Sequence, residues 1–143
     1  MIIDGKRAAD HATTTVLAYY QAYNRGDWDA MAALVDDEVA HDVNQGERQV
    51  GKARFREFLG KVAQSRREEL RHIIVMATYD GSRVAAEFAV HGTYLEAEPG
   101  QPAAHGQTYA LAGGTFFELV RGRITRVTPY YNLSDWRRQV ESQ

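Results

Sequence analysis

The segment Val16-Leu17-Ala18-Tyr19-Tyr20-Gln21-Ala22-Tyr23-Asn24-Arg25-Gly26-Asp27 says most about the fold of this chain. Four of its residues have the i, i+3, i+4, i+7 spacing of one helix face: Val16, Tyr19, Tyr20 and Tyr23. Gly26 follows where a helix commonly closes with a left-handed residue. Asp27 can then cap a second, short helix. We therefore predict a first helix from about Asp10 to Arg25, with another directly after it.

The next segments extend this helical pattern. The short second helix has an apolar side made by Trp28, Met31, Ala32 and Val35. We expect a brief strand over Glu38–Val43, after which Gly51 opens a third helix. The apolar positions of that helix again have the helical spacing: Phe55, Phe58, Leu59 and Val62.

The second half of the chain changes to a period of two, which is typical of strands. Four segments have this pattern: Leu70–Tyr79, Arg83–Leu95, Gln107–Val120 and Arg123–Tyr131. An Asp-Gly pair between the first two is a hairpin signal, and Glu96–Gly106 contains two prolines and is expected to be a longer loop. A terminal helix is predicted over Leu133–Ser142, with Asn132 or Ser134 as its cap.

Helices followed by antiparallel strands predict the α+β fold class, here as one domain over residues 1–143. The helices should cover one face of a curved antiparallel sheet. A strongly curved sheet closed by helices leaves a blind cavity, and small ligands bind in such cavities. The order of elements therefore predicts a small-molecule pocket.

Composition excludes several classes of function. The 143 residues are 44% hydrophobic and 25% charged, with a net charge of −2 and no cysteine. This balance gives no field that would attract nucleic acid or an anionic membrane, and disulfide and thiolate chemistry are excluded. No apolar run reaches membrane-spanning length, and Met1–Lys6 does not resemble a secretory signal. We therefore expect a cytoplasmic protein with neither nucleic-acid nor membrane partners.

The polar stretch His41-Asp42-Val43-Asn44-Gln45-Gly46 lies between two helical segments and is the strongest chemical signal. Asp42 could turn into the cavity, where burial would raise its pKa and make it a better base. It could equally be a strand-end carboxylate that bonds the following turn. Strand alternation directs His41 away from Asp42, so we expect a structural or surface role for His41. Asn44 could bind a ligand or serve the turn.

The chain resembles a known family over nearly its whole length, from about Ala12 onward. One set of matching residues is Tyr19…Asn24-Arg25-Gly26-Asp27…Leu34…Asp36-Asp37…Asp42…Gly51…Phe55-Arg56-Glu57-Phe58. These residues resemble the opening of the ketosteroid isomerases, members of the NTF2-like superfamily of cone-shaped α+β domains that also includes the SnoaL-like polyketide cyclases. A later set resembles ketosteroid-isomerase-related proteins: Gly122-Arg123-Ile124-Thr125-Arg126-Val127…Tyr130-Tyr131-Asn132-Leu133…Asp135-Trp136.

The resemblance implies roles for particular residues. A helix tyrosine that donates to the substrate carbonyl falls on Tyr19, and the aspartate base falls on Asp42 if one residue is deleted after Val35. Without that deletion Val43 takes the position of the base. The protonated aspartate of the isomerases' oxyanion hole maps to about Thr115, whose neutral hydroxyl is a weaker donor. The resemblance also implies a homodimer.

Strand alternation extends the expected cavity wall. Tyr109 shares the face of Thr115, so it should line the cavity if Thr115 does. In the last strand, Val127 and Tyr131 face the cavity by the isomerase register. Substrate contacts are therefore expected from Asn44, Thr115, Tyr109, Val127 and Tyr131.

Three functions remain open at this point. The first is an isomerase or cyclase without cofactor that abstracts a proton next to the carbonyl of a small hydrophobic compound, with Asp42 as base and Tyr19 as donor. The second is a non-catalytic domain that binds a small ligand or another protein. The third is epoxide hydrolysis, which needs a second acid that the sequence does not clearly supply. Glu87, His91 and His72 lack compact metal-ligand spacing, so no metal site is predicted.

Overall fold

The computed structural model describes residues 2–143, with side chains from Lys6 onward. Met1, part of the N-terminal stretch in which no signal sequence is predicted, lies outside these residues. The elements, in chain order, are α1 (Ile2–Asn24), α2 (Trp28–Leu34), β1 (Val35–Asp42), β2 (Arg48–Val50), α3 (Lys52–Ser65), β3 (Arg66–Ala77), β4 (Arg83–Tyr94), β5 (Thr108–Val120), β6 (Arg123–Tyr131) and α4 (Leu133–Glu141).

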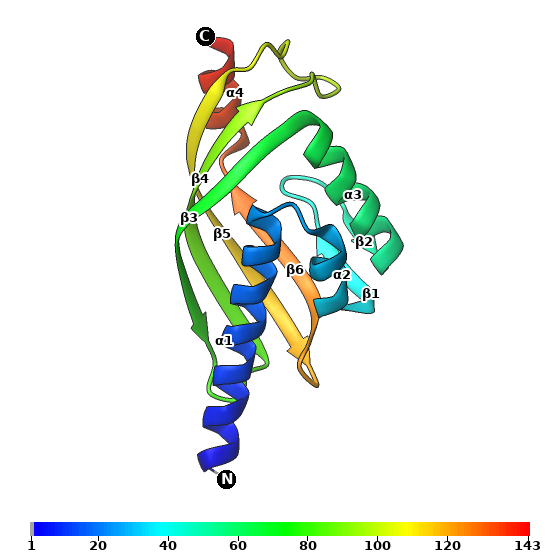
Figure 1. Cartoon of the computed structure of the whole chain (residues 1–143), viewed down its shortest axis with the longest axis vertical. Coiled ribbons are helices and arrows are strands. Elements are labelled where there is room, and N and C mark those ends of the chain that lie inside the picture. Colours follow the sequence, from blue (N-terminus) through cyan, green and yellow to red (C-terminus); the bar gives the residue numbers. More distant parts are fainter. Residues whose placement is uncertain (1) are drawn as a thin grey trace.

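The strands form one curved sheet in the order β2-β1-β6-β5-β4-β3 (Figure 1). Strands β3 to β6 form an antiparallel meander, whereas β1 pairs with β6 in parallel. The sheet is therefore mixed, not wholly antiparallel as predicted. The reason is the path of the chain, which leaves β1, crosses through α3 to the far edge and returns strand by strand until β6 lies beside β1.

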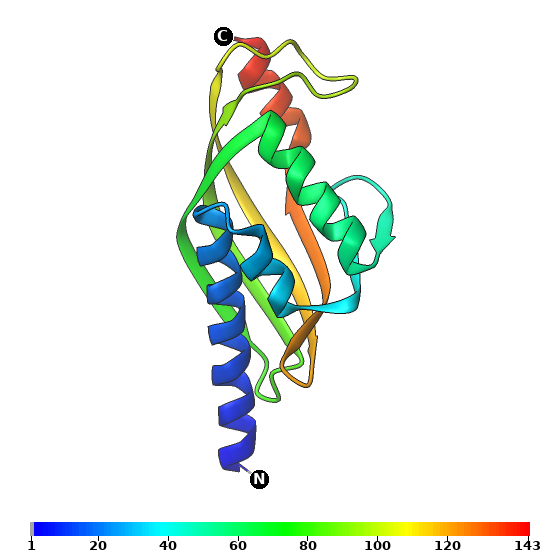
Figure 2. The ribbon, with the colours of Figure 1, turned by 45° about the vertical axis from the view of Figure 1, so that its right-hand side comes forward.

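Helices α1, α2 and α3 lie on the concave side of the sheet, and α4 lies at one end beside the loop between β4 and β5 (Figures 1 and 2). The predicted α+β architecture of helices over one face of a curved sheet is confirmed. The core between these layers contains fully buried side chains from every part of the chain, including Val16, Phe55, Phe117 and Trp136. Burial of such large apolar side chains is the main force that holds helices to a sheet.

Most element ends agree with the local signals in the sequence. Gly26 closes α1 with φ +70°, and the Asp27 side chain accepts a hydrogen bond from the Ala30 amide at 3.0 Å. Asn132, one of the two predicted caps, starts α4 by accepting from the Asp135 amide at 3.0 Å. Each cap satisfies an amide that the helix itself leaves unpaired.

Two boundaries differ from prediction in ways that matter for the site. Helix α1 begins at Ile2, well before Asp10. Strand β3 begins at Arg66, directly after α3 and four residues before the predicted start at Leu70. The first four residues of β3, Arg66-Arg67-Glu68-Glu69, are all charged, so they show no alternation of apolar and polar residues by which a strand could be recognised.

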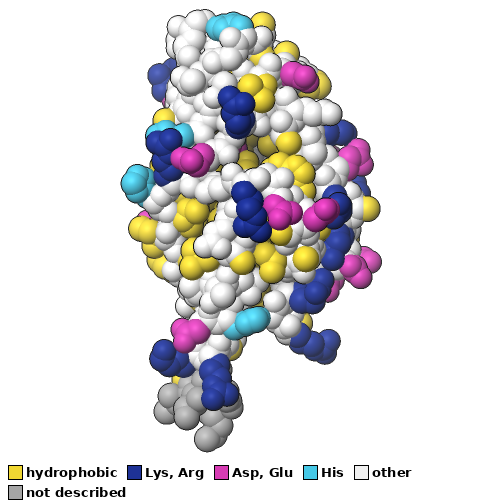
Figure 3. Space-filling view, viewed as in Figure 1, with side chains coloured by type: hydrophobic (Ala, Val, Ile, Leu, Met, Phe, Trp, Pro, Cys, Tyr) yellow, Lys and Arg dark blue, Asp and Glu magenta, His cyan; other side chains and the backbone are white. Residues whose placement is uncertain are grey.

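The surface carries no field of a single sign on the face seen in Figure 3, where Lys and Arg side chains alternate with Asp and Glu. The convex face of the sheet leaves Ile74, Met76, Phe116 and Tyr130 more than half exposed. Within residues 2–143, none of the helices combines the length and the apolar character that crossing a membrane requires. The homodimer and the cytoplasmic location expected above stay predictions.

Candidate functional site

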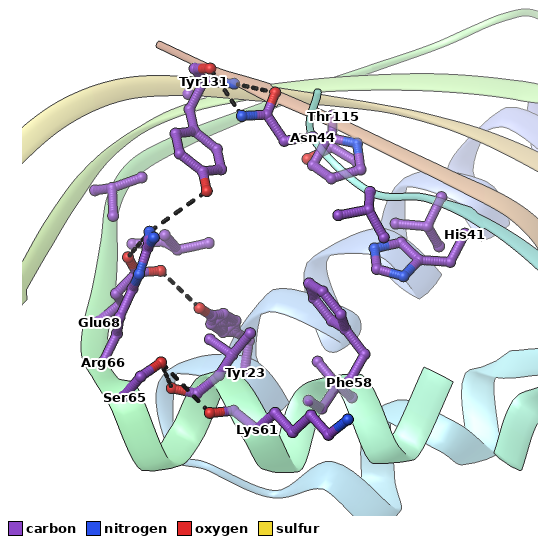
Figure 4. A pocket seen from close by; sticks show the side chains of 18 of the residues that line it. Tyr23, His41, Asn44, Phe58, Lys61, Ser65, Arg66, Glu68, Thr115 and Tyr131 are labelled. Carbon is purple, nitrogen blue, oxygen red and sulfur yellow. Dashed lines mark hydrogen bonds and ion pairs between the residues drawn. The ribbon is translucent and has the colours of Figure 1, made fainter. Parts of the chain in front are cut away.

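A cavity of about 690 Å³ lies between the concave face of the sheet, helices α1 and α3, and the loop between β4 and β5. Its size is within the usual range for small-molecule sites. Aromatic and aliphatic side chains make most of the wall, among them Tyr19, Phe55, Phe58, Leu59, Phe88 and Val127. Among the polar side chains of the wall, His41 lies on one side of the cavity and a group around Arg66 on the other (Figure 4).

The first polar group is His41, in β1, between two residues that also face inward: Val39 in the strand and Val43 directly after its end. The imidazole is 4% exposed and stands edge-on to Phe55 and Phe58, at centroid distances of 5.5 and 4.6 Å. Burial lowers the His41 pKa to about 4, although the Asp42 charge opposes this shift. Nδ1 is buried without a hydrogen-bond partner among the described residues. At neutral pH this ring is therefore an uncharged imidazole at the cavity wall.

Asp42, the predicted base, is not among the residues that line the cavity. Its carboxylate lies on the convex face, where Arg48 Nε donates to Oδ1 at 2.6 Å and Arg48 Nη2 to Oδ2 at 3.1 Å. The Thr128 hydroxyl also donates to Oδ2, at 2.6 Å. Chiefly the hydrogen bonds from Arg48 lower the Asp42 pKa to about 2. The expectation that Asp42 turns into the cavity is wrong, because β1 directs alternate residues to opposite faces and the inward set is Val39, His41 and Val43.

Tyr19, the predicted hydrogen-bond donor, does line the cavity. Its ring packs edge-on against Tyr20 and Phe117, at centroid distances of 5.2 and 5.4 Å. Burial raises its pKa well above the ordinary value, so the phenol keeps its proton. No hydrogen bond from this hydroxyl to another described residue is formed, which leaves the proton free for a ligand.

Three predicted wall positions, Thr115, Val127 and Tyr131, are in the cavity lining. Asn44 lies there too, but both ends of its amide are bonded to the main chain of Tyr131: Nδ2 donates at 3.0 Å and Oδ1 accepts at 3.2 Å. Asn44 therefore clamps the turn after β1 to the end of β6. This clamp holds the main chain that carries the Tyr131 ring.

Tyr109, also predicted to contact substrate, is outside the cavity lining. Its ring lies directly over Gly92, where an added Cβ would come within 2.3 Å of it, and packs against Trp136 of α4. The Tyr109 hydroxyl donates to Glu68 Oε2 at 2.5 Å. The prediction fails because β5 runs on beyond the cavity, and its first residues are covered by α4.

The second polar place is a buried cluster that sequence reasoning missed. Arg66 and Glu68 face inward from β3, with side chains only 8% and 12% exposed. Arg66 forms two hydrogen bonds to Glu98, from Nε at 2.7 Å and from Nη2 at 2.9 Å, and its guanidinium lies 4.0 Å from the Trp136 ring. They belong to the run Arg66-Arg67-Glu68-Glu69, and such a run of charges of both signs is typical of a solvated face. Arg66 and Glu68 have the i, i+2 spacing that continues to Leu70. A strand predicted to begin at Arg66 would therefore have placed both charged side chains on the inward face with Leu70.

Opposing effects set the ionisation of the Arg66–Glu98 pair. Burial lowers the Arg66 pKa, but the hydrogen bonds and charge of Glu98 more than offset it, and the net shift is upward. Burial raises the Glu98 pKa, yet the bonds from Arg66 and Ser65 leave it below its usual value. Both groups are therefore charged, and together they join the loop between β4 and β5 to the start of β3.

No group of His, Asp and Glu side chains suited to a metal ion occurs in the part of the chain described, residues 2–143. The site as built offers hydrogen bonds, one neutral imidazole and an apolar enclosure. These are the components of general acid–base catalysis on an uncharged organic molecule, or of simple binding.

Comparison with known proteins places this chain in a family. A family model described as the SnoaL-like domain matches residues 16–127. Comparison with curated protein sequences gives no match.

Solved structures agree with the family match. A "putative polyketide cyclase" from Xanthomonas campestris pv. campestris is 53% identical, with a TM-score of 0.91 over 93% of this chain and 98% of its own. A protein of the same description from Pseudomonas putida is 56% identical, with a TM-score of 0.89 over 90% and 97%. A "putative ketosteroid isomerase" from Kribbella flavida, 22% identical with a TM-score of 0.61 over 87% and 79%, shares the fold.

Proposed function

Because the chain belongs to the SnoaL-like domain family, with its NTF2-like fold, we propose that it is a cofactor-independent isomerase or cyclase. Its substrate is a small hydrophobic carbonyl compound, and its chemistry is the removal of a proton from the carbon next to the carbonyl. The relatives described as polyketide cyclases support this class, since ring closure between two carbonyl groups begins with that step. The assignment of individual residues rests on the geometry of this chain.

The observation that carries the proposal is the pairing of His41 with Tyr19 in one apolar enclosure. Both rings pack against Phe55, His41 at 5.5 Å and Tyr19 at 6.4 Å between centroids. The imidazole is uncharged and can accept a proton, and the phenol has a proton that no other described residue accepts. A base and a donor that pack against the same ring lie in the same part of the cavity wall, where the carbonyl oxygen and the adjacent carbon of one substrate can meet them.

In this mechanism the Tyr19 hydroxyl donates a hydrogen bond to the substrate carbonyl oxygen. His41 removes the proton from the adjacent carbon, and the electron pair of that C–H bond forms the enolate. An isomerase returns the proton to another carbon. In a cyclase the enolate carbon attacks a second carbonyl of the same molecule, and the proton passes from the imidazolium to the new alkoxide.

The low pKa of His41 has two opposite effects on this step. It makes the free imidazole a weak base, but it also keeps the ring fully unprotonated at neutral pH. The negative charge that develops on the enolate stabilises the imidazolium, because an opposite charge nearby raises a histidine pKa. The ring therefore gains basicity as the proton is transferred.

Exchange of the protons next to the carbonyl of tetralone, a bicyclic ketone, measured by NMR in D₂O, tests the proposal. His41→Gln should lower the catalysed exchange rate by about 10²–10⁴-fold, the usual contribution of a general base. Asp42→Asn is the matched control, one residue along the same strand but on its other face, and should exchange at close to the wild-type rate.

Two results would contradict this assignment. A large loss in Asp42→Asn together with normal exchange in His41→Gln would return the role of base to Asp42. Binding of tetralone by the wild type without any catalysed exchange would favour a ligand-binding domain over an enzyme.

A further inference from the structure

The buried cluster at the other end of the cavity, away from His41, has no part in the proton transfer proposed above. Besides Glu98, four of its side chains line the cavity: Tyr23, Arg66, Glu68 and Tyr131. Figure 4 shows them grouped on the side of the cavity opposite His41, with the phenols of Tyr23 and Tyr131 on either side of the Arg66 and Glu68 head groups. Charged groups are rarely enclosed in an apolar cavity unless they are paired, so the hydrogen bonds of the cluster indicate what it can recognise.

Tyr23 presents a hydrogen-bond acceptor to the cavity. Its hydroxyl donates to Glu68 Oε1 at 2.8 Å, while Tyr109 donates to Oε2 of the same carboxylate from behind the wall. Burial and the negative charge of Glu68 both raise the Tyr23 pKa, so the phenol stays protonated. Because its one hydrogen is held by Glu68, the oxygen has only lone pairs left for a ligand.

Tyr131 presents a donor. Its oxygen accepts a hydrogen bond from Arg66 Nη1 at 3.4 Å, and its own hydrogen has no acceptor among the described residues. The amide clamp from Asn44 holds the main chain at this position. Arg66 is itself bound to Glu98 through Nε and Nη2 and stacked on Trp136, so it positions Tyr131 and Glu68 and has little capacity left for a ligand.

We propose that this cluster is a hydroxyl-binding subsite, in which a ligand hydroxyl donates to Tyr23 and accepts from Tyr131. An alcohol, phenol or enol is the chemical group that both donates and accepts through one oxygen. The charges agree: one cation, Arg66, faces two anions, Glu68 and Glu98, and this excess of negative charge disfavours a carboxylate. Combined with the proposed function, on which this step rests, the substrate is a neutral hydroxy-carbonyl compound whose hydroxyl lies at the end remote from the reacting carbonyl.

Calorimetric dissociation constants for three probes test the subsite: tetralone, a hydroxytetralone and a carboxytetralone, each substituted on the ring remote from the ketone. The wild type should bind the hydroxytetralone about tenfold more tightly than tetralone, as expected for two hydrogen bonds of ordinary net strength. The carboxytetralone should bind no better than tetralone. Tyr23→Phe and Tyr131→Phe should each reduce the preference for the hydroxyl to less than about threefold.

Tyr109→Phe is the matched control. It removes a hydroxyl that donates to the same Glu68 carboxylate but lies outside the cavity wall, so this variant should keep the preference for the hydroxyl. Circular dichroism melting curves verify that each variant folds. A preference that survives in both cavity variants, a carboxytetralone that binds most tightly, or failure of all three probes to bind would each overturn the subsite.

Tetralone proton exchange, measured on the same samples, separates this inference from the proposed function. Exchange by the wild type without any hydroxyl preference overturns the subsite alone. A hydroxyl preference without exchange supports the subsite and contradicts the proposed catalysis.

Discussion

His41 and Asp42 are adjacent in the sequence, yet they lie in opposite environments. His41 faces the cavity, where burial keeps the imidazole uncharged with a pKa of about 4. Asp42 faces the convex side, where Arg48 and Thr128 keep the carboxylate ionised with a pKa of about 2. One face of the strand thus presents an uncharged imidazole, and the other presents an ionised carboxylate that is a very weak base. The comparison teaches that the face of the sheet, more than the residue type, decides which side chain can do chemistry.

The ion pairs of the two faces differ in the same way. On the concave side, Arg66 and Glu98 have side chains 8% and 25% exposed, whereas on the convex side Arg48 is 54% exposed beside Asp42. Water and salt screen a pair of the second kind, so its contribution to stability is small. A buried pair contributes little relative to apolar residues of the same shape, but removal of one partner leaves a costly uncompensated charge.

The largest effect is expected from breaking the inner pair. Arg66→Met keeps the apolar stem of the side chain but leaves Glu98 and Glu68 without their cation, and it should lower the free energy of unfolding by about 4 kcal/mol. Arg48→Met, the convex-side control, should lower the free energy of unfolding by at most about 1 kcal/mol. Urea denaturation measures both. Equal losses in the two variants would contradict the difference between the faces, and partial recovery in Arg66→Met/Glu98→Gln would support it.

A somewhat smaller effect is expected from pH. The His41 pKa falls from 6.5 in the unfolded chain to about 4 in the folded protein, so between these values the unfolded state binds the proton more readily. The contribution of the neutral ring is therefore present above pH 6.5 and is lost as the pH falls towards 4, a change of about 3 kcal/mol. The measurement is the unfolding free energy of the wild type minus that of His41→Asn across this range.

Asp42 should act in a separate and lower range, which sharpens the comparison. Its pKa is lowered from 3.8 to about 2, so the stability it contributes is present above pH 3.8 and is lost as the pH falls through 2. Asp42→Asn should remove the pH dependence of the unfolding free energy only between about 2 and 3.8, and it should leave the slope of the curve above pH 3.8 unchanged. The His41 prediction has its own contrary outcome. If the difference in unfolding free energy between the wild type and His41→Asn does not vary between pH 4 and 6.5, burial does not hold the ring neutral.

The smallest of these effects concerns packing behind the cavity. In Gly92→Ala the new Cβ would lie 2.3 Å from the Tyr109 ring, which Glu68 and Trp136 hold in place, so we expect a loss of about 2 kcal/mol. Gly60→Ala is the control: its Cβ would meet nothing within 4 Å, and in the middle of α3 alanine should stabilise by up to about 1 kcal/mol. Thermal unfolding measures both variants. Equal unfolding temperatures of Gly92→Ala and Gly60→Ala would mean that the Tyr109 ring can move away from the added methyl group.

The elements of the fold were largely predictable because their signals are local. The stripe that contains Tyr19 and Tyr23 indicates a helix, and Gly26 and Asp27 mark where one helix ends and the next begins. Three features of the architecture differ from prediction: α1 begins at Ile2, β3 begins at Arg66, and the sheet is mixed. Charged residues conceal the start of β3, and the parallel pairing of β1 with β6 depends on how strands far apart in the chain come together.

The candidate site was predictable only in part. Tyr19, Thr115, Val127, Tyr131 and Asn44 were placed at the cavity through the family resemblance and strand alternation. The polar side chain of β1 that faces the cavity was expected at Asp42 and lies at His41, and on a strand a shift of one residue moves a side chain to the other face. The neutral state of His41 has no signature in the sequence. The i, i+2 spacing of Arg66 and Glu68 indicates only that they share a strand face, because the cluster itself depends on partners that only the folded chain supplies.

By itself, then, the sequence determined the boundary between α1 and α2, the start of α4, the strand periodicity, the α+β class and the family, since each of these follows from residues a few positions apart or from a pattern of matching residues. Tertiary structure alone decided which face of β1 meets the cavity, and it joined Tyr23, Arg66, Glu68, Glu98 and Tyr131 into one polar cluster. The physical reason is that burial and hydrogen bonding are properties of the surroundings of a side chain, and those surroundings come from segments distant in the chain that meet only when the sheet curves around the cavity.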